Sequence, residues 1–228
     1  MAHNDFTHEE LNNGEDKCLC VLLLDTSGSM SGNGIAELNQ GLKQFQEQTL
    51  EDETAASRLE VAIITFGGRV QQIQSPALLT DFEMPILTPS GTTPMLQAIE
   101  EGIELTSARK EWYKSKGIQY YRPWVILMTD GEPDDISPVS AMGQRLKGLQ
   151  ENKSLVFSAI GVGDDVNMSV LDTLAQGGMT AQKLKGTNFV SFFQWLSNSI
   201  GAITAKESGD SSPAQLGSID GWATFSFN

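Results

Sequence analysis

The chain has 228 residues, of which 39% are hydrophobic, so it is long enough for one sizeable globular domain with a buried core. Its 29 acidic residues outnumber its 15 basic residues and give a formal net charge of −14, which disfavours nucleic acid and anionic membranes as main partners. No apolar run approaches the roughly 20 residues that a membrane-spanning helix needs. The first 16 residues are polar and acidic, so we expect a loosely ordered arm over 1–16 rather than a signal peptide.

From residue 17 onward, the predicted elements alternate between strand and helix. The strand patterns are mostly continuous apolar runs, as in a parallel sheet covered on both faces, and the helical patterns repeat apolar residues every three or four positions. In chain order we predict a strand at 18–24, a helix at about 35–50, a strand at 59–66, a short antiparallel strand at 70–74, mostly loop over 75–91, a helix from Pro94 onward, a strand at 124–128, a helix from about 138 to 149 capped by Asp135 or Ser137, a strand at 155–162, a short helix at about 170–176, a weak edge strand near 182–185, and a last helix at about 189–200.

This order predicts an α/β fold: a doubly wound, mostly parallel central sheet with one antiparallel edge strand and helices on both faces. We assign this domain to 17–204. Residues 205–228 turn to Ser, Gly, Asp and Pro and form a C-terminal tail, although its aromatic residues indicate a segment docked on the domain or on a partner. These aromatic residues are Trp222, Phe225 and Phe227.

The only cysteines, Cys18 and Cys20, lie two positions apart in the first predicted strand. At this spacing both side chains share one face of the strand and are poorly placed to bridge each other. They also lack further metal ligands, because both histidines, His3 and His8, lie in the arm. We therefore expect buried free thiols in a cytoplasmic protein.

The most informative segment is Asp25-Thr26-Ser27-Gly28-Ser29-Met30, directly after the first predicted strand. It places a carboxylate and hydroxyl groups at one strand end, and hard divalent cations such as Mg²⁺ prefer oxygen ligands. Two other loops carry similar groups, Ser90-Gly91-Thr92-Thr93-Pro94 and Met128-Thr129-Asp130-Gly131-Glu132. Alone, each loop is an ordinary helix cap, helix start or turn. Together they predict a metal site, provided that the strands before Asp25 and Asp130 are neighbours where the strand order reverses.

The three loops together resemble the von Willebrand factor A (vWA) domain, and the resemblance covers about residues 17–204. The forms DTSGSM and MTDGEPDD most resemble cytoplasmic bacterial vWA proteins of the tellurium-resistance type. The resemblance implies a metal-ion-dependent adhesion site (MIDAS), in which serine and threonine hydroxyls bind Mg²⁺ and the aspartates act mainly through bound waters. The residues that match this site are Asp25, Ser27, Ser29, Thr93 and Asp130, with Thr92 as the alternative to Thr93 and with Mn²⁺ or Ca²⁺ as alternatives to Mg²⁺.

A cation held by neutral hydroxyls remains electron-poor and seeks an anionic oxygen, which a Glu or Asp of another protein can supply. We therefore expect a metal-dependent protein–protein interaction module and not an enzyme. The resemblance adds an adaptor role in a bacterial stress-response or defence assembly, with kinase or phosphatase proteins as partners. Acidic neighbours of Asp130 could shape the rim of the site; they are Glu132, Asp134 and Asp135.

A Mg²⁺-dependent phosphatase or hydrolase using Asp25 and Asp130 is the first alternative. A serine nucleophile would lack a histidine base outside the arm, and Ser27 stands where an aspartyl-phosphate phosphatase carries its second aspartate. No phosphate-binding glycine loop with a lysine is present either. The sequence therefore favours the interaction module over this alternative.

Nucleic-acid binding through 109–122 is the second alternative. This segment concentrates basic residues with aromatic residues, as in proteins that bind single strands. We favour the interpretation that it is a solvated helix end and loop whose aromatic side chains pack on the domain surface.

Overall fold

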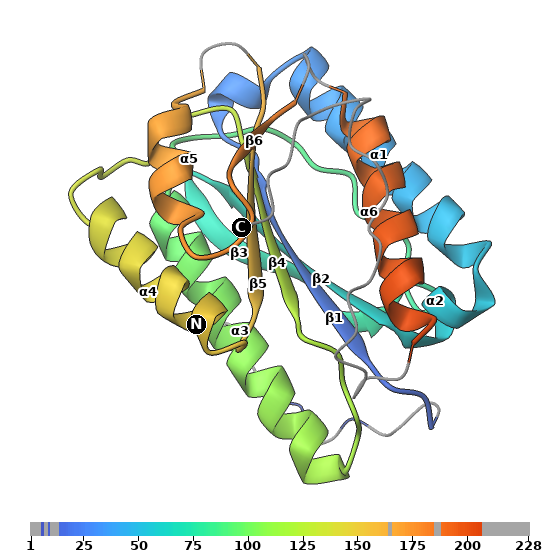
Figure 1. Cartoon of the computed structure of the whole chain (residues 1–228). Coiled ribbons are helices and arrows are strands. Elements are labelled where there is room, and N and C mark those ends of the chain that lie inside the picture. The colour runs from blue at the N-terminus through green and yellow to red at the C-terminus, as the bar shows by residue number, and fades with distance from the viewer. Residues whose placement is uncertain (1–5, 7–8, 10–13, 164–165, 185–187, 207–228) are drawn as a thin grey trace.

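The structure of the chain is a computed structural model that describes residues 6, 9, 14–163, 166–184 and 188–206 (Figure 1). The helices and strands of this described part alternate along most of the chain. In order they are β1 (Cys18–Asp25), the short 3-10 helix η1 (Gly28–Met30), α1 (Asn33–Leu50), α2 (Glu53–Arg58), β2 (Leu59–Gly67), β3 (Arg69–Leu78), α3 (Met95–Lys116), β4 (Trp124–Thr129), α4 (Val139–Glu151), β5 (Val156–Gly161), α5 (Met168–Leu174), β6 (Gln182–Lys183) and α6 (Phe189–Thr204).

The strands form one sheet in the order β3-β2-β1-β4-β5-β6. Every neighbouring pair is parallel except β2 and β3, which are antiparallel. Helices α1, α2 and α6 cover one face of the sheet, and α3, α4 and α5 cover the other (Figure 1). The predicted α/β class, with its antiparallel edge strand and helices on both faces, is confirmed.

Strand β1 lies in the middle of the sheet, and all eight of its residues are buried. Successive side chains of a strand point to opposite faces. Cys18, Cys20 and Leu22 therefore pack in the core with α1 and α6, whereas Leu19 and Val21 pack in the core with α3. Both cysteines are buried free thiols, as predicted.

The polar groups at the amino end of the sheet are paired with one another. Arg109 of α3 is 2% exposed, and it donates hydrogen bonds from Nε and Nη2 to the two carboxylate oxygens of Glu60, at 2.9 and 2.8 Å. The hydroxyl of Tyr113 donates to the same carboxylate, and Nη1 of Arg109 donates to Glu9, both at 2.5 Å. Aromatic rings surround the guanidinium, those of Phe6, Trp112 and Tyr113.

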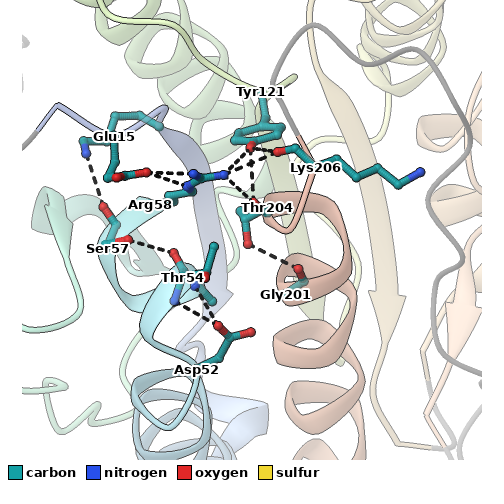
Figure 2. A network of polar contacts seen from close by, with 11 residues as sticks. Glu15, Asp52, Thr54, Ser57, Arg58, Tyr121, Gly201, Thr204 and Lys206 are labelled. Atoms are coloured by element: carbon teal, nitrogen blue, oxygen red, sulfur yellow. Dashed lines mark hydrogen bonds and ion pairs between the residues drawn. The ribbon is translucent and has the colours of Figure 1, made fainter.

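A second network joins α2 to the end of α6 (Figure 2). Arg58 donates hydrogen bonds from Nη1 to the hydroxyl of Tyr121 at 3.0 Å and to the carbonyl of Thr204 at 2.6 Å, and its Nε donates to Glu15 at 2.9 Å. Tyr121 also donates to the carbonyl of Lys206. These bonds satisfy carbonyls at the end of α6, which have no partner within the helix.

Two boundaries differ from the sequence-based expectation. Strand β3 continues to Leu78, so 75–78 are strand rather than loop. Pro76 is tolerated because β3 is an edge strand and its pairing with β2 is irregular between Val61 and Ile63. Helix α2 was not predicted, because six residues are too few for a periodic apolar pattern. Its visible signal is Asp52, whose carboxylate accepts hydrogen bonds from the N–H groups of Thr54 and Ala55 at 3.0 and 3.1 Å.

The predicted cap of α4 is wrong. The helix begins at Val139 after Pro138, and no side chain caps it. Asp135 instead accepts hydrogen bonds from the N–H and hydroxyl of Ser137, at 2.9 and 2.7 Å. Both residues serve the turn before the helix rather than the helix itself.

The basic and aromatic segment 109–122 does not form an exposed binding surface. Arg109, Trp112 and Tyr113 are buried because α3 continues to Lys116 and packs these side chains inward, and Tyr121, beyond the helix, is buried as well. Arg122 donates hydrogen bonds to the carbonyls of Leu155 and Gln150. Trp112, Tyr113 and Tyr121 lie deeper than a surface packing would place them, which disfavours nucleic-acid binding here, although that alternative stays a prediction.

The domain limits 17–204 stay a prediction. Two residues of the expected arm, Phe6 and Glu9, contact Arg109. The aromatic residues of the expected tail, Trp222, Phe225 and Phe227, lie outside the described residues. Within the described part of the chain, no helix combines the length and the apolar character needed to cross a membrane.

Candidate metal centre

The carboxyl ends of β1 and β4 bring two of the predicted loops together. These strands are parallel neighbours, with Leu24 opposite Met128, so Asp25 and Asp130 follow them at the same edge of the sheet. The hydroxyl of Ser29 donates a hydrogen bond to Oδ1 of Asp130 at 2.8 Å, and the hydroxyls of Ser27 and Ser29 are 2.9 Å apart. The predicted juxtaposition of the two loops at the point where the strand order reverses is observed.

Asp25 is the most deeply buried residue of the predicted ligand set. Its side chain is 0% exposed, and its Oδ1 accepts from the N–H of Ser27 at 2.7 Å while its Oδ2 accepts from the hydroxyl of Thr129 at 2.5 Å. Burial raises the pKa of Asp25 above its ordinary value, against these hydrogen bonds, and the nearby charge of Asp130 raises it further. Burial also raises the pKa of Asp130.

Neither carboxylate has a basic partner. Among the described residues, no Lys or Arg forms an ion pair with Asp25 or Asp130. Two neighbouring carboxylates without a cation disfavour each other's ionised form, and a bound cation relieves this repulsion. The electrostatics therefore suit a positively charged ligand.

The third loop places Thr93 beside the other two. The N–H of Thr93 donates to the carboxylate of Asp134 at 2.7 Å, and the N–H of Asp134 donates back to the carbonyl of Thr93 at 3.0 Å. Oγ1 of Thr93 lies 3.8 Å from the position that a Cβ on Gly131 would occupy. Thr93 therefore has its hydroxyl near the turn that carries Asp130.

Backbone hydrogen bonds lock the loops to one another. The N–H of Gly28 donates to the carbonyl of Gly91 at 3.1 Å, and the N–H of Ser90 donates to the carbonyl of Thr26 at 2.7 Å. Gly91 has a φ of +71°, and a Cβ there would lie 2.4 Å from the Cα of Gly68. Only glycine combines this left-handed conformation with so close a backbone approach.

The donor set fits a hard divalent cation. In an octahedral Mg²⁺ site with metal–oxygen distances of about 2.1 Å, adjacent ligands are about 2.9–3.0 Å apart. The oxygen pairs Ser27–Ser29 and Ser29–Asp130 show nearly this spacing, 2.9 and 2.8 Å. The described residues hold no group of three or more His, Cys, Asp or Glu placed for a metal, and the donors here are hydroxyls together with two carboxylates.

Sequence reasoning missed the supporting residues of the site. Thr129 binds Asp25, and Asp134 fixes the backbone of Thr93 rather than merely lining the rim. Glu132 accepts a hydrogen bond from Asn167 at 2.6 Å, which ties this loop to the start of α5. The MTDGEPDD segment contains Thr129, Glu132 and Asp134, but nothing in it reveals the loops to which they bind.

A family model for the von Willebrand factor type A domain matches residues 20–194. The chain belongs to this family. The vWA assignment runs from within β1 to the first turns of α6 and includes all three loops of the site. No curated protein sequence matches the chain.

Solved structures with the same vWA fold come from varied proteins. The ArnB paralog VWA2 from Sulfolobus acidocaldarius has 19% sequence identity and a TM-score of 0.56, over 82% of this chain and 46% of that chain. Proximal thread matrix protein 1 from the mussel byssus, with a zinc-occupied MIDAS motif, has 16% identity and a TM-score of 0.56, over 85% of this chain and 47% of that chain. The pilus adhesin SpaC from Lactobacillus rhamnosus GG, in its open conformation, has 14% identity and a TM-score of 0.64, over 83% of this chain and 30% of that chain.

The chain spans less than half the length of these three structures, and at such identities the likeness shows the fold alone. Their names place vWA domains in a pilus adhesin and a thread matrix protein, and one carries a metal at its MIDAS motif. The vWA fold is thus the common element.

Proposed function

We propose that this vWA domain binds Mg²⁺ and uses it to hold a Glu or Asp side chain of a partner protein. The proposed ligands are Asp25, Ser27, Ser29, Thr93 and Asp130, with Mn²⁺ or Ca²⁺ as alternative ions. The observation that carries this proposal is the run of oxygen contacts from Ser27 through Ser29 to Asp130, at 2.9 and 2.8 Å. The zinc-occupied MIDAS motif of the mussel protein supports the same use of the fold.

The graded burial of the ligands supports an external carboxylate as the completing group. Asp25 is fully buried and Ser27 is 2% exposed, whereas Ser29 is exposed and Asp130 is half-buried. A cation at this position has protein ligands beneath it and solvent above it. Because most of the proposed direct ligands are neutral hydroxyls, the cation keeps enough positive charge to attract an anionic oxygen from outside.

We propose further that the domain is not an enzyme. Both histidines of the chain, His3 and His8, precede β1, so neither belongs to the three loops of the site. Asp25 already accepts hydrogen bonds at both oxygens, so its lone pairs are partly occupied. These observations support a binding role over a general-base role at Asp25.

The cellular setting is also part of this proposal. The DTSGSM and MTDGEPDD motifs support the tellurium-resistance type of bacterial vWA protein, and with it an adaptor role in a stress-response or defence assembly that includes kinase or phosphatase proteins. The free thiols of Cys18 and Cys20 support a reducing compartment, and hence the cytoplasm. Fractionation of the native cell with an antibody to this chain tests the compartment directly.

Thermal unfolding with Mg²⁺ and with EDTA tests the metal site. A ligand that binds only the folded state at about 100 times its dissociation constant adds about 2.7 kcal/mol of stability, enough to raise Tm by several degrees. We expect this rise in the parent protein and its loss in Ser29→Ala. Ser140→Ala, at an exposed serine of α4, is the matched control and should respond to Mg²⁺ like the parent.

Ser29 is a better test position than Asp25. Asp25→Ala would leave the hydroxyl of Thr129 and the N–H of Ser27 without their buried acceptor, and would destabilise the fold itself. Coincident melting curves of the parent protein in Mg²⁺ and in EDTA would contradict the proposal. A pull-down from native lysate should then identify partners that bind the parent in Mg²⁺ and are lost both with EDTA and with Ser29→Ala.

A further inference from the structure

A hollow of about 290 Å³ lies directly beside the proposed metal site. One wall is the hairpin of β2 and β3, which contributes Thr65, Arg69, Gln71 and Ile73, and the other wall is the 79–90 segment, which contributes Ile86. Its floor reaches Thr26, Gly67 and Ser90, which belong to the loops that lock the metal site. Thr26 lies between the proposed ligands Asp25 and Ser27 in the chain, so the hollow is adjacent to the metal-site loops.

The outer wall of the hollow is held in place by α1. The side-chain amide of Asn39 donates to the carbonyl of Leu87 at 3.0 Å and accepts from its N–H at 2.8 Å. Gln46 donates to the carbonyls of Leu79 and Phe82 at 2.8 and 2.6 Å. The 79–90 segment has no helix or strand over most of its length, so these side chains supply the bonds that fix its path. A ligand would meet a preformed hollow, which lowers the cost of binding.

Arg69 supplies an uncompensated positive charge at this hollow. Its side chain is exposed and makes no hydrogen bond or ion pair with any described residue. Gly68, the residue before Arg69, donates its N–H to the carbonyl of Thr92 at 2.8 Å, next to the proposed ligand Thr93. In a chain with a net charge of −14, a free arginine beside the metal site complements an acidic group on a partner.

An exposed apolar side chain borders the same hollow. Ile86 is 86% exposed, the highest value among the large hydrophobic residues described, and Ile73 of the opposite wall is 38% exposed. An isoleucine this exposed contributes nothing to the core, whereas it offers apolar area to a partner. The hollow thus combines a positive charge, Arg69, with an apolar side chain, Ile86, next to the proposed metal site.

We propose that this hollow receives an extended segment of the partner protein that carries a second acidic residue. This inference rests on the proposed function, since the first acidic residue of the segment binds the metal. The second acidic residue pairs with Arg69, and an aliphatic side chain near it covers Ile86. An extended chain advances about 3.3 Å per residue, so the separation of the two points sets the spacing of the two acidic residues in the segment.

Selection from a display library of random short peptides tests the inference. The full chain is the target, binding is carried out in Mg²⁺, and bound peptides are released with EDTA. We expect the released peptides to share two acidic positions at a recurrent spacing, with an aliphatic residue close to one of them. Selection on Arg69→Glu should replace one of the two acids by Lys or Arg, whereas selection on the control Lys43→Glu should reproduce the parental pattern.

A direct binding measurement sharpens the result. Arg69→Glu should weaken the binding of a peptide selected on the parent by about fivefold or more, because the attraction between position 69 and the second acidic residue becomes a repulsion. The Mg²⁺-dependent rise in Tm should stay as in the parent, which shows that the metal site itself is intact. Peptides with one acidic position only, or an unchanged pattern on Arg69→Glu, would overturn this inference while leaving the proposed function in place. A failure to recover any EDTA-released peptide would overturn both.

Discussion

Carboxylates are buried or half-buried at both ends of the central sheet, but the groups that contact them differ between the two ends. At the amino end, Glu60 accepts hydrogen bonds from the guanidinium of Arg109 and from the hydroxyl of Tyr113. At the carboxyl end, Asp25 and Asp130 accept only from hydroxyl and backbone N–H groups of the described residues. Among the described residues, the amino end pairs its carboxylate with Arg109, whereas no Lys or Arg pairs with the carboxylates of the carboxyl end.

This difference separates a structural charge cluster from a binding site. Burying a charge is costly unless it is paired, and the chain meets that cost at Glu60 with a permanent partner. At the carboxyl end the buried charge of Asp25 still needs a partner, which a cation from solution can supply. A buried carboxylate that has a basic partner therefore indicates a structural role, and one without such a partner indicates a binding site.

The largest effect is expected from breaking the amino-end cluster with Arg109→Met. This change leaves Glu60 buried without its cation, so we expect a loss of about 3–5 kcal/mol of unfolding free energy in urea titrations. The Mg²⁺-dependent rise in Tm should persist, because the two ends are separate sites. Lys114→Met, at an exposed lysine of the same helix, is the control and should cost little. Equal stability of the Arg109 and Lys114 variants would contradict the assignment of the amino end as a structural cluster.

An intermediate effect is expected at the carboxyl end from Gly91→Ala. The new Cβ would combine a left-handed φ with a clash against Gly68, at a cost of about 1–3 kcal/mol in unfolding free energy. We also expect the Mg²⁺ response to be lost, because Gly91 fixes the loop before Thr93. Gly117→Ala is the control, because Gly117 has a matching φ of +70° but no described atom lies within 4 Å of the new Cβ. A Gly91 variant that retains the full Mg²⁺ response would show that this loop is not needed for the site.

The smallest effect is expected from thiol reagents on the native protein. Burial raises the pKa of Cys18 to about 12 and that of Cys20 well above its ordinary value. The reactive thiolate is therefore scarce at pH 8, and both residues should resist a thiol-reactive dye until denaturant is added. Fast labelling of the native protein would mean that β1 opens readily, which would contradict a rigid central sheet between the two charged clusters.

The parts of this molecule that could be predicted from sequence are those with a local pattern. The continuous apolar run of β1 and the periodic apolar positions of α1 predicted their elements closely. The meeting of two loops was predictable because Asp25 ends one buried strand, with Ser27 and Ser29 after it, and Asp130 follows another. Parallel strands bring their carboxyl ends to one edge, so the topology completed the prediction.

The parts that could not be predicted depend on long-range contacts. Arg109 in a charged, aromatic segment looked like a surface residue, because its partners Glu60 and Glu9 lie far away in the chain. The role of Asp134 at Thr93 and the approach of Gly68 to Gly91 are likewise invisible before the chain is folded. Sequence patterns show the neighbours of each residue along the chain, but not its contacts with segments that are distant in the sequence.

The three interlocked loops of the metal centre make metal binding a measure of folding. Their ligands come from segments around residues 25–29, 93 and 130, which an unfolded chain cannot hold together. Backbone hydrogen bonds between Gly28 and Gly91 and between Ser90 and Thr26 form only when the sheet is assembled. If the proposed site binds Mg²⁺, a metal titration under saturating conditions should therefore report the folded fraction of variants whose ligand loops are unchanged, such as Arg109→Met.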